Sequence, residues 1–346
     1  MKGTSMETYS PRVRPASLSV SVIAAVRILT ISALIVLAAP ALSQTEDAKS
    51  FPSRIIRIIV PASPGGVNDL LARLIGQKMS EGLGAPVIVE NKAGAATIIG
   101  AEMVARSAPD GYTILIAPTS TIAINPAVYS KLSYAPQRDF IPISAIASYP
   151  YVLTANSNVP ARTVTELIDF AKSNPDKANA GGASISFQLL VERFKARTGA
   201  PLVYVQYKSA GDAAVALMGQ QLTISFLDIA PAAPIIKSGH INALAVTAPA
   251  RLASLPDVPT MAESGLKDMT ILSWAGLFVP AGTPAPIVGK LQDEVMRIVR
   301  LPDIQQKLKE QELAPLGNTS KEFQEMIARD TDLWADIARV ANVRLN

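Results

Sequence analysis

The 346-residue sequence contains no cysteine, a single histidine (His240) and only 5% aromatic residues. The absence of cysteine excludes disulfide bonds, thiolate zinc sites and a lipid-modified N-terminal cysteine. One histidine is too few for the histidine-rich centres of metalloenzymes, and the sequence has no Asp-x-Asp-x-Asp-Gly calcium loop. The scarcity of aromatic residues argues against a stacking platform for bases or sugars. We therefore expect no metal, no cofactor and a fold stabilised by an ordinary hydrophobic core.

Positive charge is also scarce once its position in the chain is considered. The chain has 32 Lys and Arg residues against 28 Asp and Glu residues, a net charge of +4. Residues 1–43 alone carry a net charge of +3, so residues 44–346 are nearly neutral at +1 and contain no Lys/Arg block. Because nucleic-acid binding usually requires a basic patch, we expect no nucleic-acid partner.

The basic start of the chain leads into an apolar segment at residues 28–43, which ends in Ala41, Leu42 and Ser43. This order is typical of a secretory signal peptide, and cleavage is predicted after Ser43. A permanent membrane anchor is the alternative. The apolar segment of 16 residues is shorter than the roughly 20 residues that span a bilayer. We therefore expect an exported chain that has lost its leader.

Short β-branched runs alternate with amphipathic segments through the rest of the chain. Strands are predicted at residues 55–60, 87–90, 112–117, 202–205, 223–227 and 243–246. Several are apolar throughout, as expected of parallel strands that are buried on both faces. Leu70, Leu71, Leu74, Ile75 and Met79 form the apolar stripe of a helix over about residues 67–82. This alternation predicts an α/β fold with mostly parallel sheets, and the length suggests two domains.

Several helix starts carry capping signals. Thr163 and Thr319 each precede a glutamate by three residues, which is the spacing of a capping box. Thr283 precedes Pro284, which suggests a threonine cap ahead of a proline in the first turn. The last part of the chain is predicted to be helical at residues 284–300, 302–312 and 320–339, with Trp334 packing it onto the core.

Residues 58–70 are predicted to form a strand, a Pro/Gly turn and a helix start. Gly65 and Gly66 would allow the backbone to approach a ligand, and the first helix amides would favour a carboxylate or phosphate. For this segment alone, a plain tight turn is an equally good interpretation. The segment is neither a P-loop nor a Gly-x-Gly-x-x-Gly motif.

Hydroxyl groups and glycines recur where other predicted strands end. The further candidates are the Thr119, Ser120 and Thr121 run, the Gly181, Gly182, Ser184 and Ser186 loop, the turn at residues 207–211, and Asp228. Each by itself is more typical of an ordinary cap or turn. Open α/β sheets bind ligands at the carboxyl ends of their strands, so the recurrence favours a binding site.

A serine hydrolase acting on small esters or amides is the alternative function. Ser184, Asp228 and His240 follow the order nucleophile, acid, base that α/β-hydrolases use. Residues 182–186 lack the second glycine of the Gly-x-Ser-x-Gly elbow, and His240 follows Gly239 at what reads as an exposed helix end. These two departures disfavour the hydrolase.

The chain resembles the Bug-type extracytoplasmic solute receptors, the binding proteins of tripartite tricarboxylate transporters, over essentially all of residues 44–346. The matching segments are residues 52–54, 58–61 with 64–66 and Asp69, 87–92 with Gly94, 109–113, 207–208, 243–247, 255–260, and 273–274 followed by 280–284. The resemblance implies a periplasmic, non-catalytic binding protein. It would be a monomer that captures a small carboxylate, such as an organic acid, amino acid or aromatic acid, and delivers it to the membrane permease subunits.

The resemblance also implies a two-domain periplasmic-binding-protein fold of type II, which closes on its ligand like a Venus flytrap. After the signal peptide at residues 1–43, the expected first domain comprises residues 44–146 and 271–346, and the second comprises residues 147–270. The chain would cross between the domains near residues 145–149 and 271–278.

The ligand site that the resemblance implies has two walls. The residues expected to bind the ligand are Ser63, Gly65, Gly66, Asp69, Thr119 and Ser120 in the first domain, and Ser184, Ser186 and Asp228 in the second. The second group departs from the family pattern: Gln188 and Leu189 stand where His-Leu is frequent, and Leu227 separates Phe226 from Asp228. These departures leave open which carboxylate is bound.

Overall fold

A computed structural model describes Gly3, Ser10 and residues 50–345. The chain divides between Thr45 and Glu46 into two units. The predicted signal peptide and its cleavage point at Ser43 lie outside the described residues, and everything below concerns the second unit. Within the described part of the chain, no helix is both long and apolar enough to cross a membrane.

The first half of the sheet is built around three parallel strands. Strand β1 (Ile56–Val60) pairs with β2 (Val87–Asn91) on one side and with β3 (Thr113–Pro118) on the other, both in parallel. Strand β9 (Leu272–Pro280) then pairs antiparallel with β3. Ile58 and Ile59 are both fully buried, which explains the continuous apolar run read from the sequence.

Strand β4 (Phe140–Asn156) joins the two halves of the sheet. Its first part pairs antiparallel with β9, and its last part pairs antiparallel with β7 (Ile224–Asp228) and β8 (Ile241–Val246). Beyond β7 lie β5 (Asn179–Gly182) and β6 (Val203–Gln206), which run parallel, and the short β10 (Ala314–Pro315) pairs with β4. Parallel groups of strands therefore flank an antiparallel centre, and the α/β class is confirmed.

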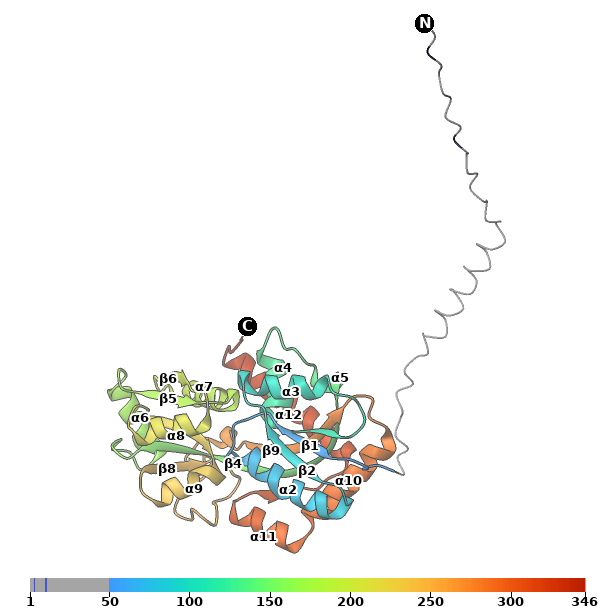
Figure 1. The fold of residues 1–346 in the computed structure, drawn as a ribbon. Helices are drawn as coiled ribbons and strands as arrows, with labels where there is room; N and C mark the ends of the chain where they lie inside the picture. The colour runs from blue at the N-terminus through green and yellow to red at the C-terminus, as the bar shows by residue number, and fades with distance from the viewer. Residues whose placement is uncertain (1–2, 4–9, 11–49, 346) are drawn as a thin grey trace. The chain divides into compact units, whose positions relative to one another are not determined.

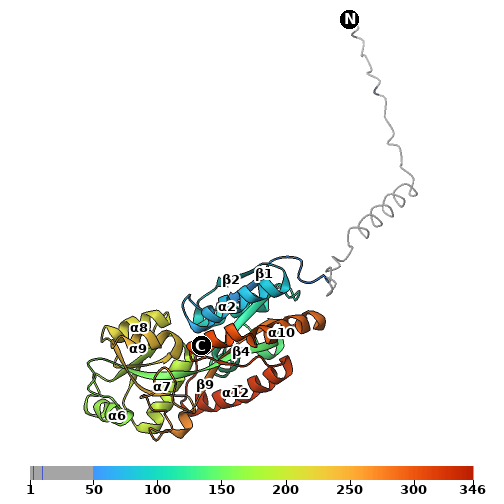
Figure 2. The same ribbon diagram turned by 90° about the horizontal axis from the view of Figure 1, so that it is seen from below.

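Helices cover both faces of the sheet (Figures 1 and 2). On the first half, Ile58 of β1 belongs to the core beneath α2 and α10, whereas the neighbouring Ile59 belongs to the core that contains Phe323 of α12. Successive side chains of a strand point to opposite faces of the sheet, so Ile58 and Ile59 pack into different cores. The helices are α2 (Val67–Leu83), α3 (Ile98–Ala105), α4 (Asn125–Val128), α5 (Pro136–Asp139), α6 (Val164–Ser173), α7 (Ile185–Thr198), α8 (Ala210–Met218), α9 (Ile229–Lys237), α10 (Ala285–Val299), α11 (Pro302–Glu310) and α12 (Ser320–Val340).

The helix starts match the capping signals in two of three cases. Thr319 forms a complete capping box with Glu322, and the Thr163 side chain accepts a hydrogen bond from the Glu166 amide. Trp334 is fully buried, as predicted. The prediction for Thr283 was wrong, because its hydroxyl donates instead to the carbonyl of Pro280 and Pro284 occupies the cap position of α10.

Candidate functional site

A cavity of about 760 Å³ lies where the ends of the parallel strands meet. The loops after β1, β2 and β3 line it from one half of the sheet, and those after β5, β6 and β7 line it from the other. Tyr149 and Tyr151 of β4 and Ser273 of β9 also line the cavity. Of the nine residues expected to bind a ligand, all but Thr119 line this cavity.

The β1–α2 loop presents backbone rather than cations to the cavity. Gly65 has a φ of +90°, a conformation that glycine adopts without strain. Gly66 is the N-cap of α2 and supplies no side-chain cap, so the first amides of this 17-residue helix are left without one. These amides and the positive end of the helix dipole favour an anion.

Asp69 holds this loop in place. Its carboxylate accepts hydrogen bonds from the Gly65 amide at 3.1 Å, from the Arg73 guanidinium at 2.9 and 3.2 Å, and from the Asn91 side-chain amide at 3.0 Å. Burial alone would raise the pKa of Asp69, but the hydrogen bonds from Arg73, Gly65 and Asn91 outweigh it and hold the pKa below its ordinary value. Asp69 is therefore a paired carboxylate that positions the loop.

Ser120 lines the cavity and Thr119 does not. The hydroxyl of Thr119 is fully buried, where it accepts hydrogen bonds from the Trp274 amide at 3.0 Å and from the Ser273 hydroxyl at 3.3 Å. Thr119 thus ties the end of β3 to β9. The sequence contains no local sign of this role, because its partners lie more than 150 positions away.

The wall after β5 is formed by the start of α7. Ser184 is the N-cap, and its hydroxyl accepts a hydrogen bond from the Ser186 amide at 3.2 Å. The two serine hydroxyl oxygens lie 3.3 Å apart. A Cβ atom at Gly182 would lie 2.8 Å from the Phe187 side chain, so glycine is required there by packing. The wall offers hydroxyl groups on a closely packed turn.

Asp228 ends β7 at the N-terminus of α9 and lines the cavity with a carboxyl group that is only partly exposed. Its side chain makes no capping hydrogen bond, and within residues 50–345 no ion pair reaches it. Burial raises the pKa of Asp228 to about 7. The carboxyl therefore changes protonation near neutral pH.

Two tyrosines accompany Asp228. Tyr151 lies opposite Asp228 in the β4–β7 register, and Tyr149, two residues earlier, shares its face of the strand. Burial, with the charge of Asp228 as the second cause, raises the pKa of Tyr149 well above its ordinary value, and the pKa of Tyr151 is raised for the same reasons. Both phenols are therefore neutral hydrogen-bonding groups.

The proposed hydrolase residues do not come together. His240 is exposed, its Nδ1 atom lies 2.7 Å from the Ser238 hydroxyl, and it is not among the residues that line the cavity. Asp228 and His240 stand at opposite ends of α9, a helix of 9 residues. At about 1.5 Å per residue, the helix separates them by ~13 Å. The Ser184 hydroxyl is engaged as a helix cap instead of contacting a histidine.

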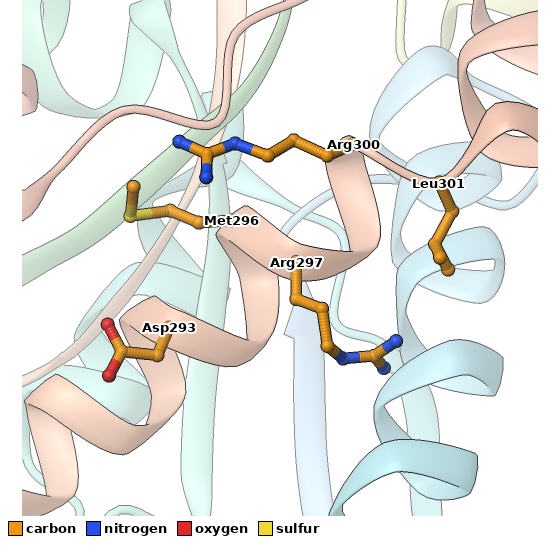
Figure 3. Close-up of a pocket in the computed structure, with 5 residues that line it drawn as sticks. All are labelled: Asp293, Met296, Arg297, Arg300 and Leu301. Carbon is orange, nitrogen blue, oxygen red and sulfur yellow. The ribbon is translucent and has the colours of Figure 1, made fainter.

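A second hollow, of about 420 Å³, lies at the end of α10. It is lined by Asp293, Met296, Arg297, Arg300 and Leu301 (Figure 3). Arg297 is paired with Glu294 at 2.6 Å, and the guanidinium groups of Arg297 and Arg300 point away from each other. No strand-end loop contributes to this hollow, so the larger cavity is the better candidate site.

Residues 71–343 match the family of tripartite tricarboxylate transporter receptors. The chain belongs to this family. The receptor is 31% identical over 304 residues to the protein BugT of Bordetella pertussis, covering 86% of this chain and 93% of BugT. The Bug-type resemblance read from the sequence is therefore confirmed.

Two solved structures from Rhodopseudomonas palustris show the same fold as the receptor. One, described with adipate, has a TM-score of 0.82 and 30% identity, covering 85% of this chain and 99% of that one. The other, MatC with bound malate, has a TM-score of 0.78 and 29% identity, covering 83% and 99%. A third solved structure, the periplasmic binding protein BugD, has a TM-score of 0.80 and 32% identity, covering 85% of this chain and 99% of that one. This likeness confirms the two-domain periplasmic-binding-protein fold.

Sequence reasoning missed several residues that line the cavity. Among them are Asn68, Tyr149, Tyr151, Phe187 and Ser273. Tyr149 and Tyr151 lie in β4, a strand absent from the sequence-based prediction, so their common face could not be read. The turn at residues 207–211 was a candidate and does line the cavity.

Proposed function

We propose that this receptor captures a small organic carboxylate in the periplasm and delivers it to the membrane permease of a tripartite tricarboxylate transporter, with no catalysis of its own. The observation that carries the proposal is the cavity at the strand ends, where the uncapped start of α2 faces inward and the nearby Asp69 is already paired. The relatives with adipate and malate support a carboxylate ligand. Export with cleavage after Ser43 belongs to the same proposal.

The proposed ligand residues are those predicted from the sequence, with Thr119 acting through the β3–β9 contact and Asp69 acting through the loop that it positions. Amides at the start of α2 would bind the carboxylate, and Ser120, Ser184 and Ser186 would supply hydroxyl groups. A hydrogen bond to a charged group contributes about 1.5–3 kcal/mol. Three or four such bonds are comparable with the ~8 kcal/mol of a micromolar complex, before the cost of ordering is subtracted.

Closure would couple binding to delivery. In the proposed arrangement, residues 44–146 with 271–346 form one domain and residues 147–270 form the other, and the ligand touches both. Only a ligand with higher affinity for the closed state shifts the hinge equilibrium. The permease would then recognise the closed, liganded monomer.

A thermal-shift screen of organic, amino and aromatic acids, followed by calorimetry of the hits, tests the proposal. Gly66→Ala adds a methyl group beside the start of α2, where no other atom lies within 4 Å of the new Cβ, so folding should be retained. We expect this variant to bind the carboxylate at least tenfold more weakly. Gly289→Ala in α10, also with no atom within 4 Å, is the matched control. Absence of stabilisation by every acid in the panel would contradict the proposal.

A further inference from the structure

One carboxyl group in the cavity, that of Asp228, receives no hydrogen-bond or ion-pair partner from the part of the chain that the structure describes. Asp69 and Asp228 both line the cavity, but Asp69 is bound by Arg73 and Asn91 whereas Asp228 has no such partner within the described residues. Lys208 also lines the cavity, yet it is exposed and forms no ion pair with Asp228. A buried carboxylate needs a cation or a hydrogen-bond donor, so the missing partner is expected to come from the ligand.

The surroundings of Asp228 suit a cation. Tyr149, Tyr151 and Phe187 all line the same cavity. The rings of Tyr151 and Phe187 lie 5.8 Å apart in an edge-to-face arrangement. Aromatic faces attract ammonium groups, most strongly where water is excluded. Asp228 and these rings together supply negative charge and π-electron density, and Lys208, the cationic residue that lines the cavity, forms no ion pair with Asp228.

The helix starts around the cavity differ in the charge of the ligand group that they favour. The serine caps Ser184 and Ser209 already satisfy amides at the starts of α7 and α8. The start of α2 has no side-chain cap and is open to an anion, whereas the start of α9 carries the carboxyl of Asp228. A ligand with one negative and one positive group complements this arrangement better than a ligand with two negative groups.

We propose that Asp228 binds the ammonium group of an amino acid or related aminocarboxylate whose carboxylate lies against the start of α2. This assignment rests on the proposed function and narrows its ligand class. Among the described residues, the other titratable or charged groups that line the cavity with Asp228 are Tyr149 and Tyr151 from β4, Tyr207 and Lys208 from the loop after β6, and Asp69 from α2. Burial brings the pKa of Asp228 near 7 in the free receptor, and a bound ammonium group favours the ionised form.

The test is calorimetry at pH 7.5 with pairs of acids that differ only in the ammonium group. The pairs are alanine and propionate, glutamate and glutarate, and phenylalanine and 3-phenylpropionate. We expect at least one amino acid to bind tenfold or more tightly than its partner. Asp228→Asn should remove that preference, and Asp228→Ser, also a good helix cap, should act in the same way. Asp212→Asn, the same change at an exposed residue that does not line the cavity, should leave the preference intact.

The outcomes separate this proposal from the one on which it rests. If glutarate or another simple carboxylate binds at least as tightly as its amino partner, and Asp228→Asn leaves that binding unchanged or improves it, the ammonium assignment is overturned and the carboxylate receptor stands. If glutarate binds with uptake of a proton that Asp228→Asn abolishes, Asp228 is a proton donor to a second carboxylate and the assignment is likewise overturned. If no acid binds, the proposed function itself fails.

Discussion

Two aspartates at helix starts in the cavity, Asp69 in the first turn of α2 and Asp228 at the N-cap of α9, differ in the hydrogen-bond partners that the protein gives them. The Asp69 carboxylate has partners from its own helix, its own loop and the neighbouring strand. Asp228 stands at a helix start, has no hydrogen-bond or ion-pair partner within residues 50–345, and has a pKa that burial raises. An aspartate at a helix start therefore positions a loop in one wall of the cavity. In the other wall, an aspartate at a helix start presents its carboxyl group to the ligand.

The largest expected effect is on the paired carboxylate. Asp69→Ala leaves the Gly65 amide without its acceptor, removes one of the two acceptors of the Asn91 side-chain amide, and takes a buried carboxylate out of a partly buried network. We expect the free energy of unfolding to fall by about 2–4 kcal/mol, measured by urea denaturation. Asp332→Ala, at an exposed position of α12, should change it by less than about 0.5 kcal/mol. Equal effects of the two substitutions would show that Asp69 does not organise the loop.

Substitution of Asp228 should raise the free energy of unfolding at alkaline pH, whereas substitution of Asp69 should lower it. Because its folded-state pKa is raised to about 7 from an ordinary value of about 4, Asp228 contributes stability below pH 4 that is lost as the pH rises to 7. The folded-state pKa of Asp69 is lowered, so its contribution is present above pH 4 and is lost in acid. We expect Asp228→Asn to be more stable than the native receptor by ~1–3 kcal/mol at pH 8.

The free energy of unfolding of both proteins, measured as a function of pH, tests the sign of this stability difference. The stability difference between Asp228→Asn and the native chain should shrink as the pH is lowered from 8 to 4. A difference that is constant over this range, or that favours the native chain at pH 8, would show that Asp228 already has a partner in the free receptor.

Gly65 and Gly66, two adjacent glycines in the wall that contains Asp69, differ in backbone conformation. Gly65→Ala places a side chain at a φ of +90° and should cost about 1–2 kcal/mol of unfolding free energy. Gly66→Ala, at a φ of −84°, should cost less than this while still weakening ligand binding. Thermal denaturation of both variants with and without ligand measures the two effects. Equal destabilisation by the two substitutions would argue against strain at Gly65.

The smallest expected effect concerns the wall that contains Asp228. Ser184→Ala removes the cap of α7 and should lower stability by about 1 kcal/mol. His240→Ala should change both stability and binding little, because His240 is exposed and does not line the cavity. Ester or amide hydrolysis that both substitutions abolish would restore the hydrolase interpretation.

Most of the secondary structure that surrounds the site could be predicted locally. The apolar run at β1, the stripe of α2 and the threonine caps of α6 and α12 all depend on neighbours a few residues apart. Strand β4 was missed as a strand, although its residues 145–149 were expected to cross between domains. Its two ends pair with different neighbours, β9 on one side and β7 and β8 on the other, and no local pattern records this.

The sequence by itself determined the receptor family, the α/β class and the strand-end loops in which eight of the nine expected ligand residues line one cavity. Tertiary structure alone decided that Thr119 turns inward to Trp274, that Asp69 is paired, and that Asp228 finds no partner among the described residues. The physical reason is that local periodicity and caps set where elements begin and end, whereas the charge state and hydrogen bonds of a side chain depend on partners brought together by distant parts of the chain.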